Sequence, residues 1–190
     1  ALILGILAAL AMVRHQFFGK KLVDMLFVAP LVVPSLIIGV ALLQFLSLAG
    51  VTDSFIRLVL GHTILTVPYT IRSIAACIYG MDPSLEEASL VMGAPPFKTF
   101  RRILLPLLRP GIVVACLFAF VISFGNLTIS VFMISANTVT IPVRIFDYML
   151  YQFDPSIAAI STVLLAVTVI VLLIAERTFG LTKMPAARIS

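Results

Sequence analysis

Residues 82–106 read DPSLEEASLVMGAPPFKTFRRILLP, and this polar stretch lies between two strongly apolar runs. Ser84 and Glu87 have the S-x-x-E spacing of a capping box, in which each side chain satisfies the other residue's free backbone N–H at a helix start. Asp82 and Pro83 offer a competing start, with an acidic cap followed by proline in the first turn. Both patterns predict a helix that begins within residues 82–84.

Gly93 and the two prolines after it predict that this helix ends and that a second one begins. Glycine often takes the left-handed conformation that closes a helix. Proline suits a first helical turn, which has no use for the missing N–H, so Pro95 and Pro96 predict the second start. If the second helix is regular, Lys98, Arg101 and Arg102 form a basic strip on its surface. Phe97, Phe100 and Leu104 then form an apolar strip on the same helix. We therefore expect a helix–turn–helix elbow over residues 82–106.

The elbow resembles a known family. Glu87-Ala88, Gly93 and Ile103-x-Leu105-Pro106 are similar to the EAA loop, E-A-A-x3-G-x9-I-x-L-P, of permeases in binding-protein-dependent ABC importers. Ser89 stands where the second alanine of the loop is found. The resemblance implies that the elbow binds in a groove of a cytoplasmic ATPase subunit. The residues expected to make this contact are Glu86, Glu87, Ala88, Ser89, Gly93, Lys98, Arg101, Arg102, Ile103, Leu105 and Pro106. The alternative interpretation is a solvated connector between membrane spans.

The composition indicates a protein that crosses the membrane several times. Hydrophobic residues make up 62% of the 190 residues and charged residues 11%, against about 25% charged residues in soluble domains. In a soluble protein a net charge of +5 would suggest nucleic-acid binding. Here most basic residues belong to one side of the membrane, which accounts for the charge, so no nucleic-acid partner is expected. Cys77 and Cys116 both lie in apolar runs, so neither a disulfide framework nor a metal site is indicated, and no cofactor is expected.

Five apolar segments are found, judged against the roughly 20 residues that cross a membrane core. We expect an all-α, polytopic transmembrane helical bundle, a single domain over 1–190, with spans at about 1–13, 25–48, 58–79, 111–134 and 157–175. The first segment is too short alone, so the chain is expected to be a fragment that begins within a span. Pro30, Pro34 and Gly39 predict a kink in the second.

Lysine and arginine counts in the short loops predict the orientation. One side has Arg57 and Arg144 only, and Arg72 lies within a span near its end. The other side collects ten basic residues: Arg14, Lys20, Lys21, Lys98, Arg101, Arg102, Arg109, Arg177, Lys183 and Arg188. The elbow and the C-terminus are therefore expected in the cytoplasm. The family resemblance adds that the membrane is the bacterial cytoplasmic (inner) membrane.

Two apolar segments carry polar residues that are candidates for a substrate pathway. Ser123-Phe124-Gly125-Asn126 interrupts the fourth segment, and discontinuous helices at membrane depth line cavities or are buried in protein. The alternative is a glycine kink that helps packing. In the third segment Thr66 and Thr70 belong to a stripe of small residues, for which packing is favoured over a pathway wall. The candidate pathway residues are Ser123, Phe124, Gly125, Asn126, Thr66 and Thr70.

Two function classes compete: the permease subunit of an ATP-driven importer, and an ion-coupled secondary carrier or other polytopic protein that needs no ATPase. A coupled carrier places carboxylates or histidines at membrane depth to hold its ion. Here all eight acids fall in loops or at span ends, and His62 is expected near an outer interface. An enzyme is disfavoured because no nucleophile–base pair or metal-ligand cluster is found. The importer is the favoured function.

The resemblance covers nearly the whole chain and implies an ABC importer permease core of five helices. It implies these partners: a second permease subunit, identical or homologous, two cytoplasmic ATP-binding subunits, an extracytoplasmic substrate-binding protein, and the lipid bilayer. ATP hydrolysis is then expected in the partner subunits.

Some short stretches are similar to the spermidine/putrescine branch of these permeases: Pro30-x-x-x-Pro34, Gly39-x-Ala41-Leu42-Leu43, Ser123-Phe124 and Ile141-Pro142-Val143. Members of that branch usually continue Ser-Phe with one or two acids, whereas this chain has Gly125-Asn126. An uncompensated cation at membrane depth costs several kcal/mol. The expected cargo is a small organic amine, polyamine or amino-acid derivative, with the missing carboxylate counting against a free polyamine.

Overall fold

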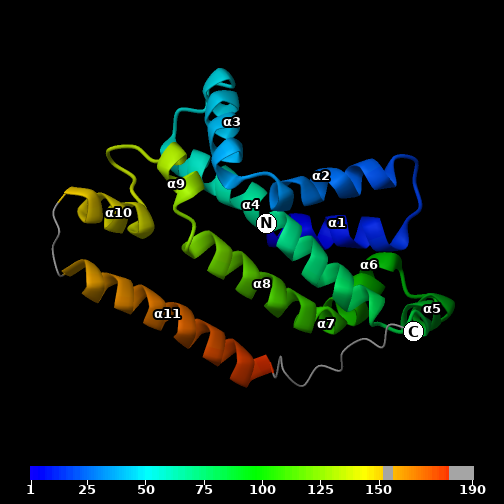
Figure 1. Ribbon diagram of the computed structural model, residues 1–190. Coiled ribbons are helices and arrows are strands. Elements are labelled where there is room, and N and C mark those ends of the chain that lie inside the picture. The colour runs from blue at the N-terminus through cyan, green and yellow to red at the C-terminus, as the bar shows by residue number, and fades with distance from the viewer. Residues whose placement is uncertain (152–155, 180–190) are drawn as a thin grey trace.

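The computed structural model describes residues 1–151 and 156–179, and within these ranges the chain is helical with no strand, as the sequence predicts (Figure 1). The C-terminal tail with Lys183 and Arg188, used to predict a cytoplasmic C-terminus, lies outside the described residues. The helices are α1 (Leu2–Arg14), α2 (Lys20–Val32), α3 (Ser35–Leu48), α4 (Ser54–Tyr79), α5 (Ser84–Val91), α6 (Pro96–Thr99), the π-turn η1 (Phe100–Leu104), α7 (Leu105–Leu107), α8 (Arg109–Phe124), α9 (Thr128–Met133), α10 (Ile141–Tyr151) and α11 (Ser156–Phe179).

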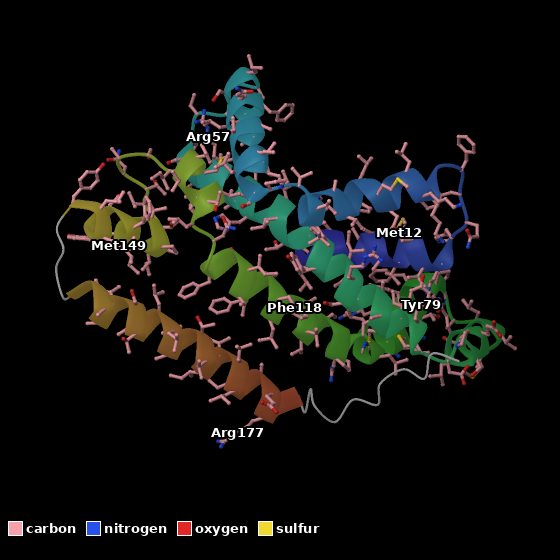
Figure 2. The ribbon with its side chains drawn as sticks, in the orientation of Figure 1. Met12, Arg57, Tyr79, Phe118, Met149 and Arg177 are labelled. Carbon is pink, nitrogen blue, oxygen red and sulfur yellow. The ribbon has the colours of Figure 1, made fainter. Side chains whose placement is uncertain are left out.

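Helix α4 lies at the centre, and α1, α2, α3, α8 and α9 all contact it (Figure 1). Asp53 is its N-cap, since the Asp53 carboxylate accepts the backbone N–H of Ile56 at 2.9 Å. Arg57 and Tyr79 mark its two ends in Figure 2. Two clusters of buried side chains surround it: Ala9, Ile71, Ile74, Ile78, Leu104, Leu108 and Ala115 in one, and Leu46, Leu58, Leu65, Ile129 and Met133 in the other.

The segment expected as one kinked span at 25–48 is two helices, α2 and α3, bent by 111°. The break falls at Val33, whose extended backbone (φ −74°, ψ 131°) is the conformation that a residue before proline favours. Pro34 then precedes the first turn of α3. Pro30 and Gly39, the other residues behind the predicted kink, lie inside helices. The bend is therefore set by Pro34 and is far larger than a kink.

The segment expected at 111–134 also departs from one straight helix. Just before this segment, residues 96–107 and α8 meet at 66°, where Pro110 has no N–H to continue the first helix into the second. At its other end α8 stops at Phe124, and α9 begins only at Thr128. The structure thus places the predicted interruption after Phe124, with Ser123 and Phe124 still helical.

Only some helices are long and apolar enough to cross a membrane alone. In the described ranges α4 and α11 pass this test, and up to four spans result if each bent pair counts as one. Helix α1 is apolar but has 13 residues. The ranges predicted for the third and fifth spans coincide with α4 and α11, the other three ranges are occupied by α1, by α2 with α3, and by α8 with α9, and the number of five spans stays a prediction.

Helices α4 and α8 approach closely at Gly111. A Cβ atom at this position would lie 2.6 Å from the Cβ of Cys77 and 3.3 Å from the backbone oxygen of Ser73. Such distances are below van der Waals contact, so only glycine fits without movement of one helix. The Cys77 side chain lies at this contact, and packing is its role here.

We predict that Gly111→Ala destabilises the protein by about 1–3 kcal/mol, the usual cost of overpacking. Cys77→Gly removes the atom that the new methyl group meets, so the double variant should recover part of the loss. Thermal unfolding of the four proteins in detergent, taken as a double-mutant cycle, measures this coupling. An alanine variant as stable as the parent would show that α4 and α8 are not in this contact.

Candidate functional site

The first helix of the elbow, α5, is capped by Asp82. The Asp82 carboxylate accepts the backbone N–H of Ser84 at 2.9 Å. The capping box expected between Ser84 and Glu87 is not formed, since α5 has no other side-chain cap at its start. Of the two competing starts in the sequence, the acidic cap before proline is the one the structure uses.

Gly93 closes α5 in the left-handed conformation, with φ +78°, as the sequence predicts. The N–H of Gly93 donates to the carbonyl of Leu90 at 2.9 Å, and the N–H of Ala94 donates to the carbonyl of Ser89 at 3.1 Å. These two bonds form a Schellman motif. Apart from its two chain neighbours, no atom of the described residues lies within 4 Å of the place where a Cβ of residue 93 would stand, so the backbone conformation alone requires glycine there.

The second helix begins at Pro96 as expected but does not continue as a regular α-helix. The N–H of Leu105 donates to Phe100, which makes residues 100–104 a π-turn. A π-turn has one more residue than an α-helical turn, and Pro106 beside it has no N–H. The basic and apolar strips predicted for this helix assumed regular α-helical spacing, and that assumption is wrong. Phe97 is 73% exposed, whereas Leu104 is buried in the core, so they do not share one apolar face.

Two side-chain contacts hold the elbow, one within it and one to α1. The hydroxyl groups of Ser89 and Thr99 lie 2.9 Å apart and join α5 to α6, both side chains being buried. Glu86 forms an ion pair with Arg14 at the end of α1. Ser89, the departure from the second alanine of the EAA pattern, is therefore part of the joint between the two helices. Thr99 is a residue that sequence reasoning missed.

The outer surface of the elbow combines apolar and charged side chains. Val91 and Met92 before the turn are 88% and 80% exposed, and Phe97 after the turn is exposed as well. Most residues expected at an ATPase contact are exposed: Glu87, Ala88, Gly93, Lys98, Arg101, Arg102 and Pro106. Three of them are partly buried, Glu86, Ile103 and Leu105, and one is buried, Ser89. A rigid, capped pair of helices with exposed apolar residues at its tip is suited to bind a groove in another protein.

A second candidate site is a cavity of about 380 Å³ where α4, α8, α9 and α10 meet. Three of the predicted pathway residues line it, Ser123, Phe124 and Asn126, whereas Gly125 does not. The side-chain oxygen of Asn126 accepts the N–H of Ile129 at 2.8 Å and so caps α9. Asn126 thus has a structural role in addition to its place in the cavity wall.

His62 is the residue of this cavity that sequence reasoning did not select. It is half-buried between three helices: Nδ1 lies 2.9 Å from the Ser123 hydroxyl of α8, and Nε2 lies 3.1 Å from the Ser130 hydroxyl of α9. The expectation that His62 merely lies near an outer interface is therefore incomplete. The contact joins residues 61 and 68 positions apart, so local sequence carries no indication of it.

Thr66 and Thr70 differ from each other in their surroundings. The Thr70 hydroxyl donates to the Val67 carbonyl at 2.8 Å, and the residue is fully buried. The Thr66 hydroxyl donates to the His62 carbonyl at 2.7 Å, but the residue also lines a second cavity, of about 360 Å³, beside the first. Packing is the role that the structure gives Thr70. Within the described ranges no three His, Cys, Asp or Glu side chains are grouped to hold a metal ion.

Comparison with known proteins identifies a family and several relatives. Residues 1–179 match the family described as binding-protein-dependent transport system inner membrane component. The spermidine/putrescine transport system permease protein PotC of Haemophilus influenzae is 28% identical over 176 residues, which cover 93% of this chain and 68% of that protein. The putrescine transport system permease protein PotI of Escherichia coli is 33% identical over 178 residues, or 90% and 63% of the two chains.

A sulfate transport system permease protein, CysT of Salmonella typhimurium, is 26% identical over 186 residues, which cover 90% of this chain and 67% of that protein. The chain thus spans about two thirds of the length of these relatives. The expected resemblance to the polyamine branch is confirmed by the PotC and PotI matches.

The cap of α5 leads to a prediction about pH. The hydrogen bonds from the backbone N–H and then the hydroxyl of Ser84 hold the pKa of Asp82 below its usual value. The stabilisation of α5 by this cap is therefore complete above about pH 3.9, the ordinary aspartate value, and is lost as the pH falls through the lowered pKa. Amide hydrogen-exchange protection of residues 84–91 should fall over that range.

Two variants control this measurement. Asp82→Asn keeps a capping oxygen that does not titrate, so protection in this variant should stay constant over the same pH range. Asp82→Ala should show reduced protection already at neutral pH. Equal protection in the alanine variant and the parent would show that Asp82 does not cap the helix.

Proposed function

Because this chain belongs to the family of binding-protein-dependent transport system inner membrane components, we propose that it is the subunit through which substrate crosses the membrane in an ATP-driven importer. The chain is a transport component and not an enzyme, and ATP hydrolysis takes place in a separate subunit. In this proposal the elbow of residues 82–106 binds that subunit and transmits its movement to the membrane helices.

The exposed, rigidly held elbow is the observation that supports this coupling role. Its two helix ends are fixed by the Asp82 cap and the Gly93 turn, and its joint by the Ser89–Thr99 hydrogen bond. The ion pair of Glu86 with Arg14 connects it to α1, and residues 96–107 lead directly into α8. A force on the elbow therefore reaches two membrane helices through short, defined contacts.

The charge distribution supports a cytoplasmic position of the elbow. Ten of the thirteen basic residues belong to the side that carries it, and only two to the opposite side. The partners in this proposal are two ATP-binding subunits on that side, a second permease subunit, identical or homologous, beside the chain, and a substrate-binding protein on the outer side.

The cavity at His62 supports the proposal that the pathway runs along α4 and α8. The residues that line it are apolar or uncharged polar, and none is a carboxylate. PotC and PotI are named for polyamines and CysT for sulfate, so similar permeases serve cargoes of opposite charge. We propose a small organic amine, polyamine or amino-acid derivative as cargo, with the missing carboxylate counting against a free polyamine.

A test of coupling follows from the open space around Gly93. Gly93→Val and Gly93→Asn both add a side chain at the exposed turn, but asparagine tolerates positive φ, whereas a β-branched residue is strained there by about 1–2 kcal/mol. We expect the valine variant to lose transport and the asparagine variant to retain it, with equal membrane insertion. Copurification of the ATPase subunit and substrate uptake in vesicles are the measurements.

Glu87→Ala completes this test. Since Asp82 and not Glu87 caps α5, the main structural role left to Glu87 is its interaction with the helix dipole, about 0.3–1 kcal/mol. A large loss of ATPase binding in this variant would therefore reflect docking. Wild-type yield of the ATPase and undiminished transport in both Gly93→Val and Glu87→Ala would contradict the coupling role.

The cargo is tested by ATPase stimulation in reconstituted vesicles, with the binding protein loaded with putrescine, spermidine or an amino-acid derivative in turn. We expect weak stimulation by the polyamines and stronger stimulation in Asn126→Asp, which keeps the α9 cap and adds a carboxylate near a cation. Asn126→Ala removes the cap, at about 0.5–2 kcal/mol, and adds no charge. Full stimulation by a polyamine that Asn126→Ala leaves unchanged would show that the missing carboxylate has no role.

A further inference from the structure

Two cavities lie one after the other along the groove between α4 and α8, which are side by side in Figure 1. The cavity farther from the elbow, called the outer cavity, has a volume of about 380 Å³ and extends from Leu58 toward Thr140 at the start of α10. The inner cavity, of about 360 Å³, extends the other way, to Thr66 on α4 and Ala119 on α8. Along both helices the lining residues of the inner cavity lie about one turn closer to the elbow than those of the outer cavity.

The two cavities share four lining residues: Val59, His62, Ser123 and Phe124. The hydrogen bond between His62 Nδ1 and the Ser123 hydroxyl, 2.9 Å long, crosses the groove at this place and joins α4 to α8. Phe124 also stacks on Phe120, with ring centroids 5.0 Å apart. The shared residues therefore lie at the boundary between the two cavities.

The hydrogen bonds around His62 fix which nitrogen carries the proton. The Ser130 hydroxyl donates its one hydrogen to the backbone oxygen of Asn126 at 2.6 Å, so it has only lone pairs to offer His62. Nε2–H of His62 must then be the donor to Ser130. In the neutral ring Nδ1 is the acceptor, and it receives the hydrogen of Ser123. The imidazole is thus held at both ends and cannot rotate unless both bonds break.

We propose that His62 and Ser123 form a gate between the outer and the inner cavity on the substrate path. This inference rests on the proposed function, in which the groove between α4 and α8 is that path. The gate opens when the hydrogen bond across the groove breaks and the end of α8 separates from α4. The non-helical residues between α8 and α9 let the end of α8 move while α9 keeps its Asn126 cap.

One unpaired hydroxyl group in the mostly apolar outer cavity supports a path over simple packing. Thr140 lines this cavity, and its side-chain oxygen is buried with no hydrogen-bond partner among the described residues. Buried hydroxyl groups are nearly always paired, so an unpaired one beside a cavity is suited to bind a polar group that enters. The class of cargo that fits is a small solute with hydrogen-bonding groups.

The test measures how fast cysteines in the two cavities react with a membrane-impermeant thiol reagent added outside. The assembled importer is reconstituted in vesicles with Cys77 and Cys116 replaced by serine. Ile141→Cys reports on the outer cavity and Ala119→Cys on the inner one. We expect fast reaction at position 141 and slow reaction at position 119.

Ser123→Ala or His62→Ala should raise the rate at position 119 about two- to tenfold for each hydrogen bond lost and leave position 141 unchanged. Ser54→Ala is the matched control, because it removes a serine hydroxyl and its hydrogen bond to Ser135 away from the shared residues. Ser123→Ala changes one atom only and keeps the test valid where the histidine variant fails to fold.

Equal rates at position 119 in the parent and in Ser123→Ala would overturn the gate, as would equally fast reaction at positions 119 and 141 in the parent. The measurement needs neither ATP nor substrate. Loss of ATPase coupling with the gate result intact would therefore contradict the proposed function alone, and the two failures are distinguishable.

Discussion

Backbone polar groups at membrane depth need hydrogen-bond partners within the protein, and this constraint limits where the chain can leave a helix. The break between α8 and α9 satisfies it locally. The Asn126 side chain accepts the N–H of Ile129, the Asn126 carbonyl accepts the Ser130 hydroxyl, and the Asn126 N–H donates to Ser123. Because these partners are present, a non-helical turn can stand beside a cavity. His62 is then held by serines on either side of that turn.

The same central helix connects the two functional regions. Helix α4 carries His62 in one half, and its other end leads into the elbow through the Asp82 cap. Helix α8 continues from the elbow and carries Ser123 at its far end. In the proposed function, a change in the elbow thus acts on both helices of the proposed gate. The ion pair of Glu86 with Arg14 holds α1 to the same elbow.

The sequence predicted best those features that depend on local backbone chemistry. The turn at Gly93, the start at Pro96 and the presence of an interruption near residues 123–126 follow from residues at the site itself, although the structure places that interruption after Phe124. It could not choose between the two starts of α5, because both satisfy the same N–H groups. The π-turn, the Ser89–Thr99 bond and the contacts of His62 require the packed structure, since their partners come together only when helices meet.

Contact between the elbow and the ATPase subunit is the central claim. A photo-reactive amino acid at Met92, at the exposed end of α5, tests it in the assembled importer, with the same group at Asp53 on the opposite side as control. The account predicts adducts with the ATPase subunit from position 92 and none from position 53. An ATPase that stays in the complex but forms no adduct at position 92, or forms one at position 53, would contradict it.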